Sequence, residues 1–263
     1  MADKNIYFCS DAHLGSHYHK DPLAAEIKLV TFLKSIEENA REIFFVGDMF
    51  DYWFEYKDVV PRGFVRFLGQ CASMSDKGIK LHFFTGNHDC WMSDYFEREF
   101  GAIIHHKSFI FENNGYKFRV SHGDEEYTGY SMRLKWMYRL FNSKVARFFY
   151  AALHPRWTVG LAYWLSYNSR KRGLKKQTEG RIPHALCNDY FDIENEWLVR
   201  KTKEFILKDP SIDFYIYGHR HLMLDLALKE QKRCIILGDW ITYDSYAQWD
   251  GKTLCLCSIH DFE

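Results

Sequence analysis

The sequence predicts an α/β fold in which a largely parallel, helix-covered sheet precedes closely spaced strands, with an inserted helical segment between the two parts. Strand-like and helical patterns alternate in the first half, whereas strand patterns crowd together after residue 221. Between these parts, residues 136–167 are rich in aromatic and basic side chains and contain no acid. A chain of 263 residues suffices for one large domain, or for a domain with an insert.

The first half alternates short apolar runs with helical patterns. The runs "NIYFCSDAH", "EIFFVGDMFD" and "KLHFFTGNHD" have the length and the Ile, Val, Phe and Tyr content of buried strands. Residues 21–40 and 62–78 between them have helical patterns, and Asp21 with Pro22 forms a start signal for the first helix. In that helix Leu23, Ile27, Val30 and Leu33 share one face. This alternation favours a mostly parallel sheet covered by helices.

The second half of the chain has a different pattern from the first. The runs "YKFRVSHGD" and "DFYIYGHRH" continue the strand pattern on either side of the aromatic segment. After them, residues 222–228, 232–239 and 253–259 form closely spaced strand patterns, which predict antiparallel pairing.

Composition limits the classes of function. The formal net charge is zero, so an attraction for anions must be local and no nucleic-acid partner is expected. The seven cysteines are odd in number and have no zinc or disulfide spacing, which indicates reduced thiols and favours a cytoplasmic protein. The first residues, "MADKNIYFCSDAHLG", do not have the pattern of a signal peptide.

Polar residues end each of the five apolar runs named above. In open α/β sheets, ligands bind beyond the carboxyl ends of strands, so these residues should meet at one place. The candidate ligands are Asp11, His13, Asp48, Asn87, His122, His219 and His221. Their mixture of carboxylate, amide and imidazole suits manganese, iron or zinc. The set is too large for one tetrahedral ion and fits two ions that share a carboxylate.

These motifs, "DAH", "GDMFD", "GNHD", "SHGD" and "GHRH", resemble the ordered motifs of the calcineurin-like metallophosphoesterase family. The resemblance implies an αββα sandwich that holds two divalent ions, with manganese expected and iron or zinc as alternatives. It implies that one ion is held by Asp11, His13, Asp48 and His221. It implies that the other is held by Asp48, Asn87, His122 and His219, with Asp48 bridging.

The same resemblance assigns catalytic roles to two neighbouring residues. His88 matches the histidine that stabilises the transition state or protonates the leaving oxygen, and Asp89 would orient it. Asp51 and Asp124 are interpreted as residues that shape the loops or support the ligands.

The aromatic segment from Trp136 to Tyr167 could be a membrane span, a core helix or an interfacial surface. A span needs about 20 consecutive apolar residues, and the longest uncharged run here, residues 157–169, is shorter. Aromatic residues with basic flanks and no acids are typical of a surface that meets lipid. We therefore expect a helical cap that contains an acyl-chain chamber near Trp157, Leu161, Trp164 and Leu165. A self-packed cap with solvated lysines is the alternative.

Further segments narrow the resemblance to the UDP-2,3-diacylglucosamine pyrophosphohydrolase subfamily of lipid A biosynthesis. They are "GDMFDYWFEY", "YNSRKRGLKK" and "IILGDWITYDSYAQWDG". The likeness implies a core of residues 1–126 and 182–263 and a helical cap of residues 127–181. It also implies substrate contacts from Asn87, His88, Ser169, Arg170, Lys176 and His219. The chain departs from that subfamily at His88, where an arginine is usual, and at Tyr130 and Gly173.

The resulting hypothesis is a dinuclear-metal hydrolase. By resemblance, it cleaves the pyrophosphate of UDP-2,3-diacylglucosamine through attack of a metal-activated water on the α-phosphorus, giving UMP and 2,3-diacylglucosamine 1-phosphate (lipid X). The alternatives are a phosphoesterase acting on another lipid-linked or nucleotide phosphodiester, and a membrane-surface adaptor on the same fold. The expected partners are the lipid-linked UDP-sugar and an anionic membrane surface, with the protein peripheral to the cytoplasmic side of the inner membrane. The oligomeric state is left open.

Overall fold

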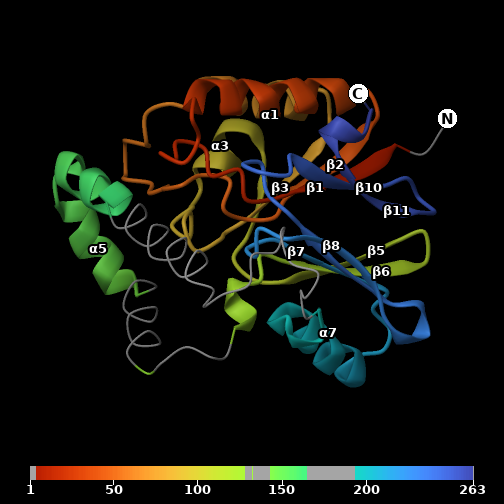
Figure 1. Ribbon diagram of the computed structural model, residues 1–263. Helices are drawn as coiled ribbons and strands as arrows, with labels where there is room; N and C mark the ends of the chain where they lie inside the picture. The colour runs from red at the N-terminus through yellow and green to blue at the C-terminus, as the bar shows by residue number, and fades with distance from the viewer. Residues whose placement is uncertain (1–3, 128–131, 133–142, 165–192, 263) are drawn as a thin grey trace.

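Two β-sheets lie face to face between layers of helices in the computed structural model (Figure 1). The structure describes residues 4–127, 132, 143–164 and 193–262. Helix α1 lies along the outer side of one sheet and α7 lies on the outer side of the other. This arrangement confirms the predicted α/β class and the αββα sandwich.

The first sheet is six-stranded, in the order β11-β10-β1-β2-β3-β4. Its strands are β1 (Asn5–Cys9), β2 (Ala40–Phe45), β3 (Lys80–Phe84), β4 (Ile103–His105), β10 (Ser245–Trp249) and β11 (Leu254–Ser258). Strands β1 to β4 are parallel, as the alternation of strands and helices predicts, and β10 and β11 add antiparallel at the β1 edge. The carboxyl ends of β1, β2 and β3 therefore point the same way.

The second sheet is five-stranded, in the order β5-β6-β7-β9-β8. Its strands are β5 (Phe109–Asn113), β6 (Tyr116–Ser121), β7 (Phe214–Tyr217), β8 (Met223–Ala227) and β9 (Arg233–Leu237). Strands β6, β7 and β9 are parallel, and β8 pairs antiparallel with β9. The antiparallel pairing expected after residue 221 is thus correct for β8–β9 and β10–β11, but β9 also joins β7 in parallel. Close spacing in sequence cannot reveal that long-range pairing.

Apolar side chains divide into three layers that fit this sandwich. One cluster lies between the first sheet and its helices α1 (Pro22–Ile36), α2 (Val65–Asp76) and α3 (Tyr95–Phe100). A second fills the space between the sheets, and Phe8, Phe44 and Phe118 are fully buried there. A third packs α7 (Trp197–Lys208) on the second sheet. Burial on both faces explains why the central strands are apolar almost without alternation.

The first helix begins as predicted. The Asp21 side chain accepts hydrogen bonds from the backbone amides of Leu23 and Ala24, which caps the helix. Its buried face differs from the one expected, because Leu23 and Ile27 are 47% and 44% exposed. The core face instead continues from Val30 and Leu33 to the other buried positions, Glu26, Leu29, Phe32 and Ile36.

The described part of the aromatic segment is helical, with α5 (Lys144–Ala152) and a second helix over residues 155–164. Helix α5 reaches the core through the Tyr150 hydroxyl, 3.1 Å from that of Tyr52, and through Arg147, whose Nη2 donates to the Cys90 carbonyl at 3.2 Å. The second helix does so through Thr158, whose hydroxyl is hydrogen-bonded to that of Tyr56. In the part of the chain that the structure describes, no helix is long and apolar enough to cross a membrane. The boundaries predicted for the insertion, residues 127 and 181, stay a prediction.

Other described turns are short 3-10 helices. They are η1 (Asp124–Glu126), η2 (Ile193–Asn195), η3 (Lys229–Gln231) and η4 (Ile259–Phe262).

Candidate metal centre

Each candidate ligand follows the carboxyl end of a parallel strand, as the sequence predicts. Asp11 and His13 follow β1, Asp48 follows β2, and Asn87 follows β3. From the second sheet, His122 follows β6, while His219 and His221 follow β7. The residues with left-handed backbone among them are Asp11, His13, Asp48, His219 and His221. Non-glycine residues adopt that conformation at a cost, and such strain is concentrated at functional sites.

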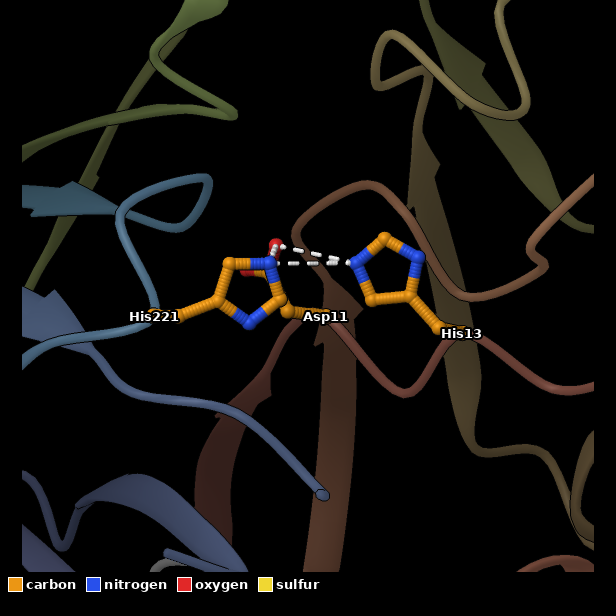
Figure 2. A group of neighbouring side chains, drawn as sticks. All are labelled: Asp11, His13 and His221. Carbon is orange, nitrogen blue, oxygen red and sulfur yellow. Dashed lines mark hydrogen bonds and ion pairs between the residues drawn. The ribbon is translucent and has the colours of Figure 1, made fainter. Parts of the chain in front are cut away.

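Asp11, His13 and His221 form the first group of ligands (Figure 2). The Nε2 atoms of the two histidines are 3.3 Å apart, and each faces Oδ1 of Asp11, at 3.7 Å for His13 and 3.6 Å for His221. Asp11 and His13 are buried, whereas His221 lies at the open side of the group. The three side chains thus converge on one point, as ligands of a single cation do.

Asp48, His122 and His219 form the second group. Oδ2 of Asp48 lies 3.4 Å from Nε2 of His122 and 3.7 Å from Nε2 of His13, which belongs to the first group. The same carboxylate oxygen therefore faces both groups. The family resemblance implies a bridging role for Asp48, and that role stays a prediction.

Three buried polar atoms test whether this site suits a metal ion. Within the described residues, Asp11 Oδ1, Asn87 Oδ1 and His122 Nε2 are buried and have no hydrogen-bond partner. Buried polar atoms are nearly always hydrogen-bonded, so such a concentration requires an explanation. All three are ordinary ligands of divalent transition metals, and the residues present therefore fit a divalent metal site.

The outer sides of the imidazole rings are held by the protein. Nδ1 of His122 contacts the Val46 carbonyl oxygen at 2.9 Å, and Nδ1 of His221 contacts Oδ2 of Asp239 at 2.8 Å. Such contacts orient the ring and leave Nε2 available to a metal. Sequence analysis missed Asp239, although it follows the apolar run of β9 through Gly238 in the same strand-end pattern as the ligands.

The structure corrects the expected environment of His88. Its Nδ1 lies 3.1 Å from the Asp51 carbonyl oxygen and 3.6 Å from Asp51 Oδ1. The Asp89 carboxylate, expected to orient His88, instead accepts backbone amide hydrogens from Gly86 at 2.7 Å and from Met49 at 2.9 Å. Asp51 therefore lies beside the histidine, and Asp89 fixes the loops that follow β2 and β3.

Burial and neighbouring charges set the protonation of the site. Burial raises the pKa of the Asp11 carboxyl. Burial also acts to raise the pKa of Asp48, but the adjacent His122 and His88 rings outweigh it and hold that pKa well below its usual range. Burial opposes protonation of His122, yet the Asp48 carboxylate raises the pKa of the ring well above its usual value. The Asp48 carboxylate therefore favours positive charge beside it, which a divalent cation would provide.

The pKa of His219 moves in the other direction. Burial lowers it well below the usual value, and the nearby His122 adds to the effect. The ring is therefore held neutral, which is the form that binds a metal.

Two glycines allow the loops to approach this closely. A Cβ atom on Gly86 would lie 2.2 Å from Asp48 Oδ1, and one on Gly218 would lie 1.9 Å from Ser10 Oγ. Ser10 in turn donates a hydrogen bond to Asp11 Oδ2. Side chains at either glycine would push a ligand out of place.

A two-sheet sandwich with Asp, His and Asn gathered at its strand ends defines a metal-binding phosphoesterase. The chain belongs to the calcineurin-like phosphoesterase family, whose model matches residues 4–223. The resemblance based on the five motifs is therefore confirmed.

Similar proteins cover nearly the whole chain. A protein named UDP-2,3-diacylglucosamine hydrolase from Porphyromonas gingivalis is 57% identical over 258 residues, which cover 98% of each chain. Proteins of the same name are 24% identical in Aliivibrio fischeri, over 98% of each chain, and 25% identical in Haemophilus influenzae, over 90% of this chain and 91% of the relative.

Some predicted contacts lie outside the described residues. They are Ser169, Arg170 and Lys176. Leu165 of the expected chamber and the departures from the subfamily at Tyr130 and Gly173 also lie outside them. Sequence analysis assigned no function to Arg147, which the structure brings from α5 to the loop after β3. No local pattern marks that contact, because it joins segments 57 residues apart.

Proposed function

We propose that this protein is a dinuclear-metal hydrolase that cleaves the pyrophosphate of UDP-2,3-diacylglucosamine to UMP and 2,3-diacylglucosamine 1-phosphate in lipid A biosynthesis. The observation that carries the proposal is the 57% identity, over 98% of the chain, to the Porphyromonas gingivalis protein of that name. The clustered carboxylates and imidazoles at the strand ends support the same chemistry.

The proposed cofactor is a pair of divalent ions, with manganese preferred. Support comes from the groups that contain Asp11 and Asp48, and from Asp48 Oδ2, which faces both of them. A third potential group, His13, Asp51 and His88, shares His13 with the first. Two such ions supply a water molecule of lowered pKa and neutralise charge on the phosphoryl oxygens.

The remaining proposed roles belong to the chain itself. His88 would donate a proton or hydrogen bond to the reacting phosphate, since its Nδ1 is held by Asp51 and its ring meets that of His13 edge-on with centroids 4.7 Å apart. Its backbone amide also donates to Asp48 Oδ1 at 2.8 Å, so His88 and the bridging carboxylate are fixed relative to one another. Asn87 and His219 would contact substrate phosphate from the same side.

An apolar hollow beside the second cap helix is the proposed site of an acyl chain. Its volume is about 430 Å³, and it lies between residues 56–62 and residues 155–163. Its apolar lining includes Val59, Val60 and Val159, and its cationic residues are Arg62 and Arg156. Apolar walls with cations nearby suit a lipid that carries phosphate.

One comparison of substrates tests the proposed function. Purified protein with manganese should hydrolyse UDP-2,3-diacylglucosamine far faster than UDP-sugars without acyl chains, and EDTA or Asp48→Asn should abolish both reactions. Equal rates on the two classes of substrate would favour a phosphodiesterase of broader specificity. Manganese binding without hydrolysis of either substrate or of a bis-aryl phosphate would favour the adaptor.

We also propose that the protein associates peripherally with the cytoplasmic face of the inner membrane. On the helix of residues 155–164, Trp157, Leu161 and Trp164 are 69%, 52% and 59% exposed, and they follow the spacing of one helical face. Such a face, with Arg156 beside it, suits an anionic lipid surface. Replacing all three residues by Gln should weaken flotation with anionic vesicles, whereas Leu207→Gln, at a residue of α7 that is 87% exposed, should not. Equal flotation of both variants would contradict this placement.

A further inference from the structure

The loop after β7 carries two candidate ligands in a strained conformation. His219 and His221 have φ angles of 67° and 47°, in the left-handed region. Backbone contacts restrain part of the loop, since the Gly218 amide donates to the His122 carbonyl at 3.0 Å and the His219 amide donates to Asp11 Oδ2 at 2.8 Å. Residues keep a strained backbone conformation only where several surrounding contacts hold it in place.

A bidentate ion pair adds a restraint from another element. Arg220 lies between the two histidines, and its Nε and Nη2 donate to Oε1 and Oε2 of Glu196 at 2.8 and 2.9 Å. The Glu196 side chain is only 3% exposed, and the Arg220 side chain is 33% exposed. A planar guanidinium that meets a carboxylate through two bonds fixes direction as well as distance. The pair therefore sets the orientation of the backbone between the two histidines.

Glu196 also links the ligand loop to the start of α7. It immediately precedes α7, and the next residue, Trp197, has its ring centroid 6.2 Å from that of His219. The Trp197 ring also meets the ring of Tyr127 edge-on at 5.1 Å, and Tyr127 follows the "SHGD" motif. The start of α7 therefore contacts both the ligand loop and the segment after that motif.

We propose that Glu196 and Arg220 are a positioning pair that holds His219 and His221 in the geometry required for metal binding and ties their loop to the start of α7. This inference rests on the proposed metal centre. Neither residue touches the substrate in this role. Their effect is on the affinity for the metal and on the order of the loop.

Manganese binding to the metal-free protein, measured by electron paramagnetic resonance, tests the pair. Glu196→Gln and Arg220→Lys should each weaken binding about 10- to 100-fold, the range for residues that orient metal ligands. Saturating manganese should restore most of the hydrolysis of a bis-aryl phosphate. Arg220→Lys is the more informative variant, because it keeps the cation and loses only the two-bond geometry.

The chain offers a second bidentate pair as a control. Arg233 donates from Nε to Asp225 Oδ1 at 3.1 Å and also contacts Oδ2, but it lies at the amino end of β9, away from Asp239. The two side chains are 25% and 32% exposed, so Arg233→Lys and Asp225→Asn should lower the melting temperature only slightly and leave the manganese affinity within about twofold of wild type.

The possible outcomes are distinguishable. Wild-type manganese affinity in folded Arg220→Lys would overturn the inference, as would an equal loss of affinity in the control variants. If Glu196→Gln does not fold, Arg220→Lys decides alone. Failure of the wild-type protein to bind manganese would refute the proposed metal centre itself, and with it this inference.

Discussion

At the scale of single residues, the site depends on two carboxylates outside the predicted set of ligands. Asp51 faces two histidines, since its Oδ1 lies 3.5 Å from Nδ1 of His13 and 3.6 Å from Nδ1 of His88. Asp89 is fully buried and ties the loops after β2 and β3 together through backbone amides. The two carboxylates thus have different tasks, although both follow strands of the same sheet.

We expect His88 to act in the chemical step and not in holding the metal. His88→Ala should lower turnover of a bis-aryl phosphate about 10²- to 10⁴-fold, the usual contribution of a positioned acid or base. Its manganese content, measured by elemental analysis, should stay near that of the wild type. Loss of both ions in His88→Ala would show that this residue is a ligand or a structural group instead.

A substitution at Gly86 tests how closely the loops after β2 and β3 must approach one another. In Gly86→Ala, the new Cβ would lie 2.2 Å from Asp48 Oδ1, so the bridging carboxylate must shift. Because a displacement of about 1 Å can cost about 10²-fold in rate, we expect a loss of that order in steady-state hydrolysis.

The matched control for Gly86→Ala is Gly69→Ala in α2. A Cβ atom at Gly69 has no neighbour within 4 Å, and alanine favours helix by about 0.5–1 kcal/mol. Gly69→Ala should therefore raise the melting temperature slightly and leave hydrolysis unchanged. Wild-type activity in Gly86→Ala would mean that the loop relaxes without moving Asp48.

At the scale of elements, the helix over residues 155–164 combines two kinds of surface. On residues 155–164, Trp157, Leu161 and Trp164 face solvent, while Val159 and Tyr163 line the apolar hollow. The chamber predicted from Trp157, Leu161 and Trp164 is therefore misplaced, because their spacing puts them on the outer face of the helix. Aromatic content identified the segment but could not assign its faces.

Val159 tests whether the hollow holds an acyl chain. Val159→Asn places an amide on an apolar wall, and each methylene removed from apolar contact costs about 0.8 kcal/mol. The KM for the diacylated substrate should therefore rise, while hydrolysis of a small soluble phosphodiester stays near wild type. Val145→Asn, at a position that is 66% exposed on α5, is the matched control. Equal loss of both activities in Val159→Asn would mean that the residue serves only the fold.

At the scale of the whole molecule, the sequence predicted the site better than the packing around it. The gathering of strand-end Asp, His and Asn residues could be predicted because carboxyl ends of parallel strands meet at one edge. Asp239 and the two histidines that Asp51 contacts could not be predicted, because such partners depend on how the loops fold back. The exposed Leu23 and Ile27 show the same limit, since a helical pattern does not fix how the helix is rotated on its sheet.

Which phosphorus atom the water attacks depends on how the substrate, the ions and the chain are arranged together. A pyrophosphate offers two phosphorus atoms, and water that attacks the α-phosphorus leaves its oxygen in UMP, whereas attack on the sugar-side phosphorus leaves it in the sugar phosphate. From the resemblance to the pyrophosphohydrolase subfamily, we expect attack at the α-phosphorus. Hydrolysis in ¹⁸O-water followed by mass spectrometry should therefore place the label in UMP. Products incubated in ¹⁸O-water after the reaction provide the control for exchange. Label in the sugar phosphate and none in UMP would reverse the assignment while leaving the metal centre intact, because the same ligands could activate water toward either phosphorus.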